Sequence, residues 1–300
     1  MRRTDRHSAA ALHASPAHDA RCVDKVGPPP GDAAHAGSDP QVRSVSSRDN
    51  PVLRLVRRLV EQPTAYRQIG QVWLEGEHLC QAVLARGWQP ARAVVSQTGW
   101  GRAPLAALAR AAPRVDVLTD ALFAQLGGMP SPSSLGFLVD VPAAPELLPS
   151  RAAVLLDRVQ DAGNVGSILR TAAAMGVTQV LATVGTAALW SPKVLRAGMG
   201  AHFSLRLVEG LEARDLDALE VPLLAGSSHA SRELTDLALP DPCVWVLGHE
   251  GQGVCAEMIS RCALTVRIPQ PGGEESLNVA AAAAICLYES ARQRRASSRA

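Results

Sequence analysis

The sequence predicts an α/β protein of two folded units, and the second unit is expected to contain a mostly parallel sheet. Apolar strand-like runs alternate with helix-like segments along the chain after residue 50, which is typical of α/β layers. Residues 142–150 interrupt this alternation with a proline-rich stretch that indicates a short linker. In the second unit, three buried-type strands each lead into a polar loop that contains glycine and then into a helix. Strands separated by helices favour a parallel sheet covered on both faces.

The composition limits the classes of protein to which the chain can belong. Its 300 residues are 47% hydrophobic and only 3% aromatic, so its cores must depend on Ala, Leu and Val. The net charge of +2 at pH 7 implies that nucleic-acid binding would use local basic patches. The six cysteines form no CxxC pair, which indicates neither disulfides nor a metal site and favours the cytoplasm. No apolar run approaches the roughly 18 residues of a membrane span.

Residues 1–50 predict a disordered tail, because they are rich in Ala, Ser, Pro and Asp and show no hydrophobic period. The histidines of this region are irregularly spaced and do not predict a metal site. The apolar stretch Ala9–Leu12 is too short for the core of a signal peptide.

The first unit, residues 51–141, is expected to open with a helix. Apolar residues between Leu53 and Val60 recur at helical spacing, and Arg54, Arg57 and Arg58 occupy the opposite face. That basic face is either a solvated surface or a patch that contacts phosphates. The elements expected to follow are Gln71–Glu75, Glu77–Arg86, Ala91–Ser96, Pro104–Ala111, Val115–Leu118, Asp120–Leu126 and Leu135–Val141.

The second unit, residues 151–293, is expected to alternate strands with helices and to end in a tail at 294–300. The expected strands are Ala153–Leu156, Gln179–Val184, Leu205–Val208, Pro222–Ala225, Val244–Leu247 and Leu264–Ile268. The expected helices are Val165–Met175, Ser191–Ala201, Arg214–Leu219, Ala256–Arg261 and Ser276–Arg292, the last with Ser276 as its N-cap. Ligands of such sheets bind at the carboxyl ends of the strands, where all three polar loops are placed.

The three strand–loop–helix stretches are Leu155–Ala172, Val244–Val254 and Ile268–Ala280. Together, in this order and spacing, they resemble the signature motifs of the SpoU (TrmH-like) branch of the SPOUT RNA methyltransferases. The resemblance implies transfer of a methyl group from S-adenosylmethionine to a ribose 2'-hydroxyl of RNA. It also implies a deep trefoil knot near the C-terminus and a homodimer formed through this domain, with residues of both chains shaping the site.

The first unit resembles, less specifically, the ribosomal-protein-like substrate-binding domain found ahead of many SpoU enzymes. Residues 74–77 and 127–131 carry this likeness. It implies that the unit helps to hold RNA. The candidate contacts are Arg67, Arg86, Arg92 and Arg102.

The resemblance assigns catalytic positions residue by residue. They are Asn164, Arg170, Glu250, Ser276 and Asn278. The family casts the arginine as the activating base, but a guanidinium hardly loses its proton near neutral pH. Arg170 is therefore equally a candidate to hold a phosphate or to stabilise the developing alkoxide. Glu250 is the chemically easier base, and Asn164 is expected also to cap the helix at Val165.

The resemblance also assigns the cofactor site. Backbone groups at Gly248, Ile268 and Leu277 are expected to hold S-adenosylmethionine, and Leu224, Ala225 and Gly226 to line its adenosine side. One departure from the family pattern is Gly198, where members often have serine.

Three readings of function remain to be compared. A ribosomal RNA 2'-O-methyltransferase is favoured by the attached first unit, with transfer RNA as the second substrate class. A non-catalytic RNA-binding relative would be favoured if the catalytic positions were substituted, and they are present. A dinucleotide-binding dehydrogenase is disfavoured, because Ala162–Gly166 lacks the G-x-G-x-x-G spacing.

Overall fold

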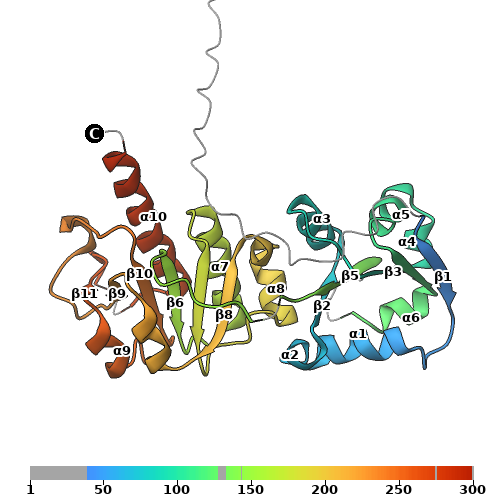
Figure 1. The fold of residues 1–300 in the computed structure, drawn as a ribbon, viewed down its shortest axis with the longest axis horizontal. Coiled ribbons are helices and arrows are strands. Elements are labelled where there is room, and N and C mark those ends of the chain that lie inside the picture. Colours follow the sequence, from blue (N-terminus) through green and yellow to red (C-terminus); the bar gives the residue numbers. More distant parts are fainter. Residues whose placement is uncertain (1–38, 128–132, 143, 274–275, 299–300) are drawn as a thin grey trace, which may run out of the picture.

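The computed structural model describes residues 39–127, 133–142, 144–273 and 276–298. Two domains lie side by side in Figure 1, the first from blue to green and the second from yellow-green to red. Most of the tail predicted for residues 1–50, and most of the stretch 127–131, lie outside the described residues.

The first domain contains a five-stranded sheet in the order β1-β4-β3-β5-β2. Strands β1, β4 and β3 run parallel to one another, and β5 pairs antiparallel with both β3 and β2. Its strands are β1 Gln41–Val45, β2 Gln71–Glu75, β3 Arg92–Ser96, β4 Arg114–Leu118 and β5 Leu135–Asp140. Its helices are α1 Pro51–Glu61, α2 Tyr66–Ile69, α3 Glu77–Ala85, α4 Gln97–Trp100, α5 Ala103–Ala109 and α6 Asp120–Ala124.

Strand β1 corrects the sequence analysis, which placed residues 41–45 in a disordered tail. Within β1 only Val45 is buried, so the segment has no apolar alternation to reveal it. Helix α1 follows the prediction. Asn50 caps it by accepting the Val52 N–H at 2.9 Å, and the buried face includes Leu53 and Val56.

The second domain contains a six-stranded sheet in the order β11-β9-β10-β6-β7-β8, in which every neighbouring pair is parallel. The prediction of a mostly parallel sheet is therefore confirmed. Its strands are β6 Ala153–Asp157, β7 Gln179–Thr183, β8 Arg206–Leu211, β9 Leu223–Gly226, β10 Val244–Gly248 and β11 Leu264–Val266. Its helices are α7 Ala162–Ala174, α8 Pro192–Gly198, α9 Ala256–Arg261 and α10 Val279–Ser297, with short 3-10 turns at Ala201–Ser204, Ala213–Ala218 and Leu234–Asp236.

The two faces of this sheet bury alternate residues of each strand, as the pleat requires. On one face Val154 and Trp245 join a core that includes residues of α7 and α10 and extends into the first domain. On the other face Leu155 and Val246 pack with Met258 of α9. Both faces are covered, which accounts for the nearly continuous apolar strands.

Among the boundaries that differ from prediction, three concern α7 and α10. Helix α7 begins at Ala162, capped by Asp161, so Asn164 lies in its first turn rather than capping it. Helix α10 begins at Val279, and its cap is Asn278 rather than Ser276. The same helix continues to Ser297, so the domain extends past the predicted end at residue 293.

A polar and aromatic joint connects the two domains. The Tyr66 hydroxyl donates to Glu209 of β8 at 2.6 Å, and the same carboxylate accepts the Leu189 N–H at 2.8 Å and pairs with Arg67 at 3.2 Å. Burial and the Glu209 carboxylate raise the pKa of Tyr66 well above its usual value, so the phenol remains a donor. The Trp88 indole donates to the carbonyl oxygen of Phe203 at 3.2 Å.

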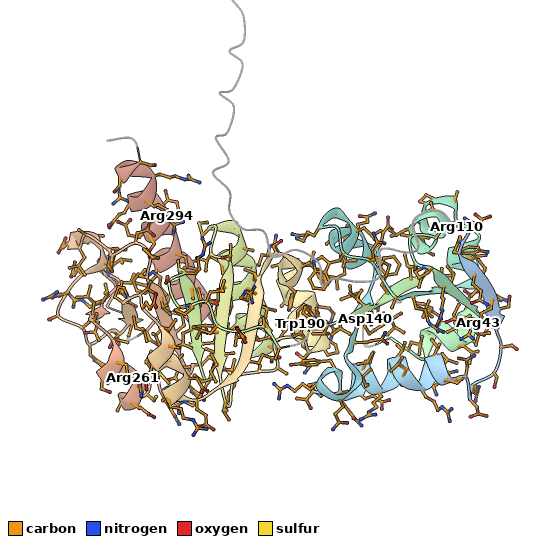
Figure 2. All side chains as sticks on the ribbon, viewed as in Figure 1. Arg43, Arg110, Asp140, Trp190, Arg261 and Arg294 are labelled. Atoms are coloured by element: carbon orange, nitrogen blue, oxygen red, sulfur yellow. The ribbon has the colours of Figure 1, made fainter. Side chains whose placement is uncertain are left out.

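The joint between the domains contains several of the few aromatic residues of the chain. Trp88 packs edge-on against Phe203 at a centroid distance of 5.2 Å, and Trp190 lies 5.2 Å from the ring of the buried His202. Figure 2 shows Trp190 at the junction of the two domains. Buried ring contacts combined with hydrogen bonds to a carboxylate indicate a defined angle between the domains rather than a free hinge.

We expect Tyr66→Phe to lower the free energy of unfolding by about 1.5–3 kcal/mol, the range for a hydrogen bond to a charged group. The loss follows because Glu209 keeps its position but loses a donor. Urea unfolding of the Tyr66→Phe, Glu209→Gln and double variants measures the coupling between the two side chains. Fully additive losses would show that the two residues do not interact across the joint.

Candidate active site

The three polar loops meet at the carboxyl edge of the second sheet, as the sequence predicts. A chain of hydrogen bonds connects them. Asn278, before α10, donates from Nδ2 to Asn164 Oδ1 at 2.9 Å, and Asn164, in the first turn of α7, donates from Nδ2 to Glu250 Oε1 at 3.0 Å. Glu250 follows β10, so side chains from three separate segments form one polar cluster.

Glu250 is the acceptor at the end of this chain. Its carboxylate also accepts the backbone N–H groups of Gln160 at 3.2 Å and Asp161 at 3.1 Å. Burial alone raises the pKa of Glu250, but the hydrogen bonds from Asn164 and from backbone N–H groups outweigh it and lower the pKa below its usual value. The carboxylate is therefore ionised at neutral pH.

This environment argues against the prediction that Glu250 is the easier general base. A base acts best when its pKa lies near the working pH and a lone pair is free to take the proton. Glu250 has a lowered pKa and already accepts several donors. The geometry instead suits it to holding the loop after β6 and the amide of Asn164 in position.

Asn278 and Asn164 leave donors available for a ligand. Asn278 Oδ1 accepts the backbone N–H groups of Ala280 at 2.9 Å and Ala281 at 3.2 Å, which caps α10 and orients the amide. Each amide group carries two N–H hydrogens, and the chain described above uses one from each side chain. The second hydrogen of each remains to donate to a hydroxyl, alkoxide or phosphate oxygen.

The turn after β10 is shaped by its backbone. His249 and Gly253 exchange two backbone hydrogen bonds, and His249 Nδ1 accepts the Gly251 N–H at 3.0 Å. A Cβ on Gly248 would lie 2.1 Å from Gly253 C and from Val254 N, so only glycine fits beneath this turn. His249 is thus a loop-forming side chain.

Three residues that sequence reasoning did not single out support the cluster. Asp161 Oδ1 accepts the Asn164 N–H at 2.7 Å and so caps α7. Asp157, buried at the end of β6, accepts the Cys255 N–H at 2.8 Å and pairs with Arg158 at 3.2 Å. Gln160 contributes its backbone N–H. An Asp three residues before Asn164 is a capping signal that was available in the sequence.

Arg170 and Ser276 lie outside this hydrogen-bonded cluster. Arg170 is exposed on α7, six residues after Asn164 and hence about 9 Å farther along the helix axis. Its side chain forms no hydrogen bond or ion pair with a described residue. Ser276 is exposed and has no hydrogen bond to a described residue. Asn164, Glu250 and Asn278 are therefore the predicted residues that one chain brings together.

The residues predicted to hold the cofactor differ in how deeply they are buried. Leu224 and Ala225 are fully buried in the sheet, so the structure leaves neither of them exposed at the predicted adenosine side. Gly226 ends β9, and a Cβ built on it would meet no atom within 4 Å, so open space faces this strand end. Gly248 and Ile268 are half-buried at neighbouring strand ends, and Leu277 is 38% exposed.

A buried acceptor without a hydrogen-bond partner supports a ligand site at the carboxyl edge of the second sheet. The side-chain oxygen Oε1 of Gln270, in the loop after β11, is buried and has no hydrogen-bond partner in the part of the chain that the structure describes. Buried acceptors without a donor are rare in proteins. An amino group or hydroxyl of a ligand beside Gly226 and Ile268 would satisfy it.

The described residues contain neither a metal-binding cluster nor a membrane-spanning helix. No group of three or more His, Cys, Asp or Glu side chains within 39–127, 133–142, 144–273 and 276–298 is arranged to hold a metal ion. None of the helices in these ranges is long and apolar enough to cross a membrane.

Most of the arginines predicted to contact RNA already have partners in the protein. Arg67 pairs with Glu209, and Arg92 pairs with Asp116 at 2.8 Å. Arg86 donates to Ser204 Oγ at 2.7 Å within the joint. Among these four candidates, Arg102 is exposed, and its side chain forms no hydrogen bond or ion pair with a described residue.

Comparison with known proteins gives the same family at the level of sequence. The model of the SpoU rRNA Methylase family matches residues 151–288. An uncharacterized tRNA/rRNA methyltransferase of Synechocystis sp. is 32% identical over 267 residues, which cover 86% of this chain and 96% of that protein. RlmP, a 23S rRNA guanosine 2'-O-methyltransferase of Bacillus subtilis, is 30% identical over 57% of this chain and 70% of its own length.

Solved structures extend the likeness beyond the second domain. A crystal structure of an RNA 2'-O ribose methyltransferase superposes with a TM-score of 0.71 at 28% identity, over 84% of this chain and 99% of that chain. The AdoMet-bound rRNA methyltransferase of Sinorhizobium meliloti gives 0.72 at 27% identity, over 85% and 98%. AviRb of Streptomyces viridochromogenes with AdoMet gives 0.73 at 25% identity, over 82% and 98%.

We expect Asn164→Asp to destabilise the protein at neutral pH, by on the order of 1–2 kcal/mol, because it replaces a donated hydrogen bond with carboxylate repulsion. Repulsion raises the folded-state pKa of the carboxyl pair above the unfolded value, so the penalty is present above that pKa and shrinks as the pH falls through it. Urea unfolding at pH 7.5 and pH 4.5 measures the difference. Asn164→Ala is the control for loss of the hydrogen bond alone, and its pH dependence should be smaller, because it removes a bond that lowers the pKa of Glu250 but adds no second carboxylate. Equal losses for Asn164→Asp at both pH values would contradict the arrangement.

Proposed function

The chain belongs to the SpoU rRNA methylase family, and we propose that it methylates a ribose 2'-hydroxyl of ribosomal RNA. It is an S-adenosylmethionine-dependent RNA 2'-O-methyltransferase. The observation that carries the proposal is the cluster of Asn164, Glu250 and Asn278, whose spare amide N–H groups suit an oxygen that gains negative charge.

Ribosomal RNA is favoured over transfer RNA by the relatives. RlmP of Bacillus subtilis and RlmB of Bordetella pertussis are both named as 23S rRNA methyltransferases, the latter 35% identical over 161 residues. The Synechocystis relative, whose name includes both RNA classes, supports transfer RNA as the weaker alternative. A ribosomal RNA substrate would place the enzyme in the cytoplasm, which also agrees with the free thiols of its described cysteines.

Bound S-adenosylmethionine would supply an electrophilic methyl group, and the protein must align the 2'-oxygen and stabilise its charge. Asn164 and Asn278 would donate to that oxygen. Glu250 would hold the amide of Asn164 from behind. Arg170 would supply the positive charge, either at the developing alkoxide or at the adjacent phosphate. Ser276, near Asn278, would orient the ribose.

The cofactor would occupy the carboxyl edge of β9, β10 and β11. Backbone groups at Gly248, Ile268 and Leu277 would hold it, Gly226 would leave room for it, and Gln270 would gain a donor. These strand ends fit a flat polar ligand, because they combine backbone donors and acceptors with small side chains.

A trefoil knot is the topology that we propose for this edge. The chain between β9 and β10 runs parallel to the segment that leaves β11, where the N–H of Leu234 donates to the Arg267 carbonyl and the N–H of Arg267 to the Arg232 carbonyl, each at 2.8 Å. The same connection reaches α10, where Gln293 Nε2 donates to the Leu237 carbonyl at 2.8 Å. Contacts on both sides of the segment are those that a threaded chain would make.

A homodimer through the second domain is supported by an apolar stripe on and before α10. The exposed hydrophobic residues of this stripe are Leu277, Ile285 and Tyr288, with exposures of 38%, 40% and 59%. Exposed apolar residues that share one helix face mark interaction surfaces. Helix α7 packs against α10, so a second copy on the stripe would bring exposed Arg170 near residues of both chains.

RNA binding by the first domain is the remaining part of the proposal. The outer face of α1 presents Arg54, Arg57 and Arg58, and none of them pairs with a carboxylate of a described residue. Unpaired arginines on one helix face suit the phosphates of RNA. This face of α1 is a stronger candidate than the arginines that the joint already uses.

Incubation of the purified protein with labelled S-adenosylmethionine and total RNA from cells lacking it tests the function. We expect a 2'-O-methyl mark in ribosomal RNA, mapped by resistance to alkali or nuclease. Arg170→Ala should lower methylation by about 100-fold to 1000-fold, as for the loss of one charge-stabilising donor, while cofactor binding is kept. Arg214→Ala, another exposed arginine of the domain, is the matched control. Cofactor binding without any mark would contradict the proposal.

We expect the protein to sediment as a dimer and Ile285→Asp to shift it to a monomer, because the substitution places a charge in an apolar interface. Sedimentation velocity measures the change. Arg295→Asp, on the same helix beyond the stripe, should leave the dimer intact. A wild-type chain that sediments as a monomer at micromolar concentration would refute the interface.

A further inference from the structure

A cavity of about 660 Å³ lies between the two domains. Trp73 and Glu75 of β2 line it from the first domain, and Ala188, Lys193 and Leu195 line it from the second. Figure 1 shows β2 and α8 facing each other at this junction. Its volume lies within the range of pockets that enclose small organic ligands.

The cavity adjoins the catalytic cluster. Gln160 and Asp161 line it, and the backbone N–H groups of the same two residues donate to Glu250. Ala162, the first residue of α7, is also part of the wall, two positions before Asn164. A ligand group in the cavity would therefore lie next to a ribose held by Asn164.

The walls combine an apolar surface with carboxylates. Trp73 and Leu195 are buried side chains, and the Trp73 Nε1 has no acceptor in the part of the chain that the structure describes. Glu75 is 9% exposed and accepts the Ser133 hydroxyl at 3.2 Å. Glu61 and Asp161 add two further carboxylates, so the cavity offers an apolar surface together with several acceptor oxygens.

Lys193 is unusual for this chain. The sequence contains only Lys25 besides it, and arginine is the basic residue everywhere else. Lys193 is exposed on α8. It pairs with no carboxylate of a described residue. A phosphate at the mouth of the cavity would give this cation a partner.

We propose that this interdomain cavity binds an unstacked guanine base of the RNA beside the methylated ribose, with Lys193 on the adjoining phosphate. Single-stranded RNA is read through bases that are splayed out of the stack and bound at their edges. Guanine presents two adjacent N–H donors on its Watson–Crick edge, which one carboxylate can accept together. Glu75 is positioned as that acceptor, and the apolar wall with Trp73 covers the ring. The inference rests on the proposed RNA methyltransferase function.

Lysine-directed labelling tests the cavity without methyl transfer. A tetranucleotide ending in guanosine is oxidised with periodate, so that its terminal ribose carries two aldehydes. The Lys193 amine condenses with an aldehyde with loss of water, and cyanoborohydride reduces the imine to a stable amine that mass spectrometry locates. We expect at least 10-fold more label on Lys193 than on Lys25, saturation with probe, and weaker labelling by adenosine-ended and uridine-ended probes.

Substitution by a large side chain inside the cavity wall tests the proposal, and the same substitution outside the wall is the control. Thr64 is an exposed residue of the cavity wall, and Gln62 is equally exposed but lies outside it. Thr64→Trp should reduce Lys193 labelling at least 10-fold, and Gln62→Trp should leave it unchanged. Ala188→Phe fills the opposite wall and should act like Thr64→Trp. Cofactor binding in each variant reports whether the second domain is intact.

Glu75→Gln tests the choice of base. The substitution keeps the size of the side chain but replaces an acceptor oxygen with a donor, so the preference for guanosine-ended probes should disappear while cofactor binding remains. Equal labelling of both lysines, or labelling that ignores the base and the filled cavity, would overturn the proposal. Methylation of RNA together with labelling that does not distinguish Lys193 from Lys25 would refute only the proposal that the cavity binds a base. Selective labelling without methylation would refute only the proposed reaction.

Discussion

The ionised carboxylate of Glu250 is the acceptor on which the arrangement of the site depends. It holds the loop after β6 through two backbone N–H groups and α7 through Asn164, which in turn accepts from Asn278. Because these donors lower its pKa, the carboxylate stays charged over the range in which the enzyme works. A neutral or displaced Glu250 would release both loops, so the electrostatics of one side chain set the geometry of the cluster.

The second constraint is the rigid joint, which sets where RNA bound by the first domain meets that cluster. His202 illustrates how closely the joint is packed. Burial lowers the pKa of its imidazole to about 4, so the ring is neutral, and its Nε2 donates to the Leu189 carbonyl oxygen at 2.8 Å. A Cβ at Gly198 would lie 2.6 Å from its Cε1. The glycine that departs from the family pattern is therefore explained by the histidine ring that occupies the space of a serine side chain.

The sequence predicts the strands of the second domain well, because they are apolar runs between helices. It predicts helix caps poorly. Asp161 and Asn164 are both suitable caps for α7, as Ser276 and Asn278 are for α10, and only the backbone path decides between them. Strand β1 escapes prediction because it buries only Val45. The motifs identify Asn164, Glu250 and Asn278, whereas the pairing of Arg67 and Arg92 with distant acids depends on tertiary contacts that no local pattern encodes.

Arginine and lysine have different roles at the junction of the two domains. Arginines near the joint are used as forked donors to specific acceptors, such as Arg67 to Glu209 and Arg86 to Ser204. A phosphate of a mobile RNA is contacted more easily by a long, flexible side chain than by a planar guanidinium in a fixed position. Lys193 has such a flexible side chain. Its position at the interdomain cavity, beside the loop that Glu250 holds, places phosphate binding and ribose alignment on opposite sides of one short stretch of chain. The rigid joint would then keep that spacing constant between one RNA and the next.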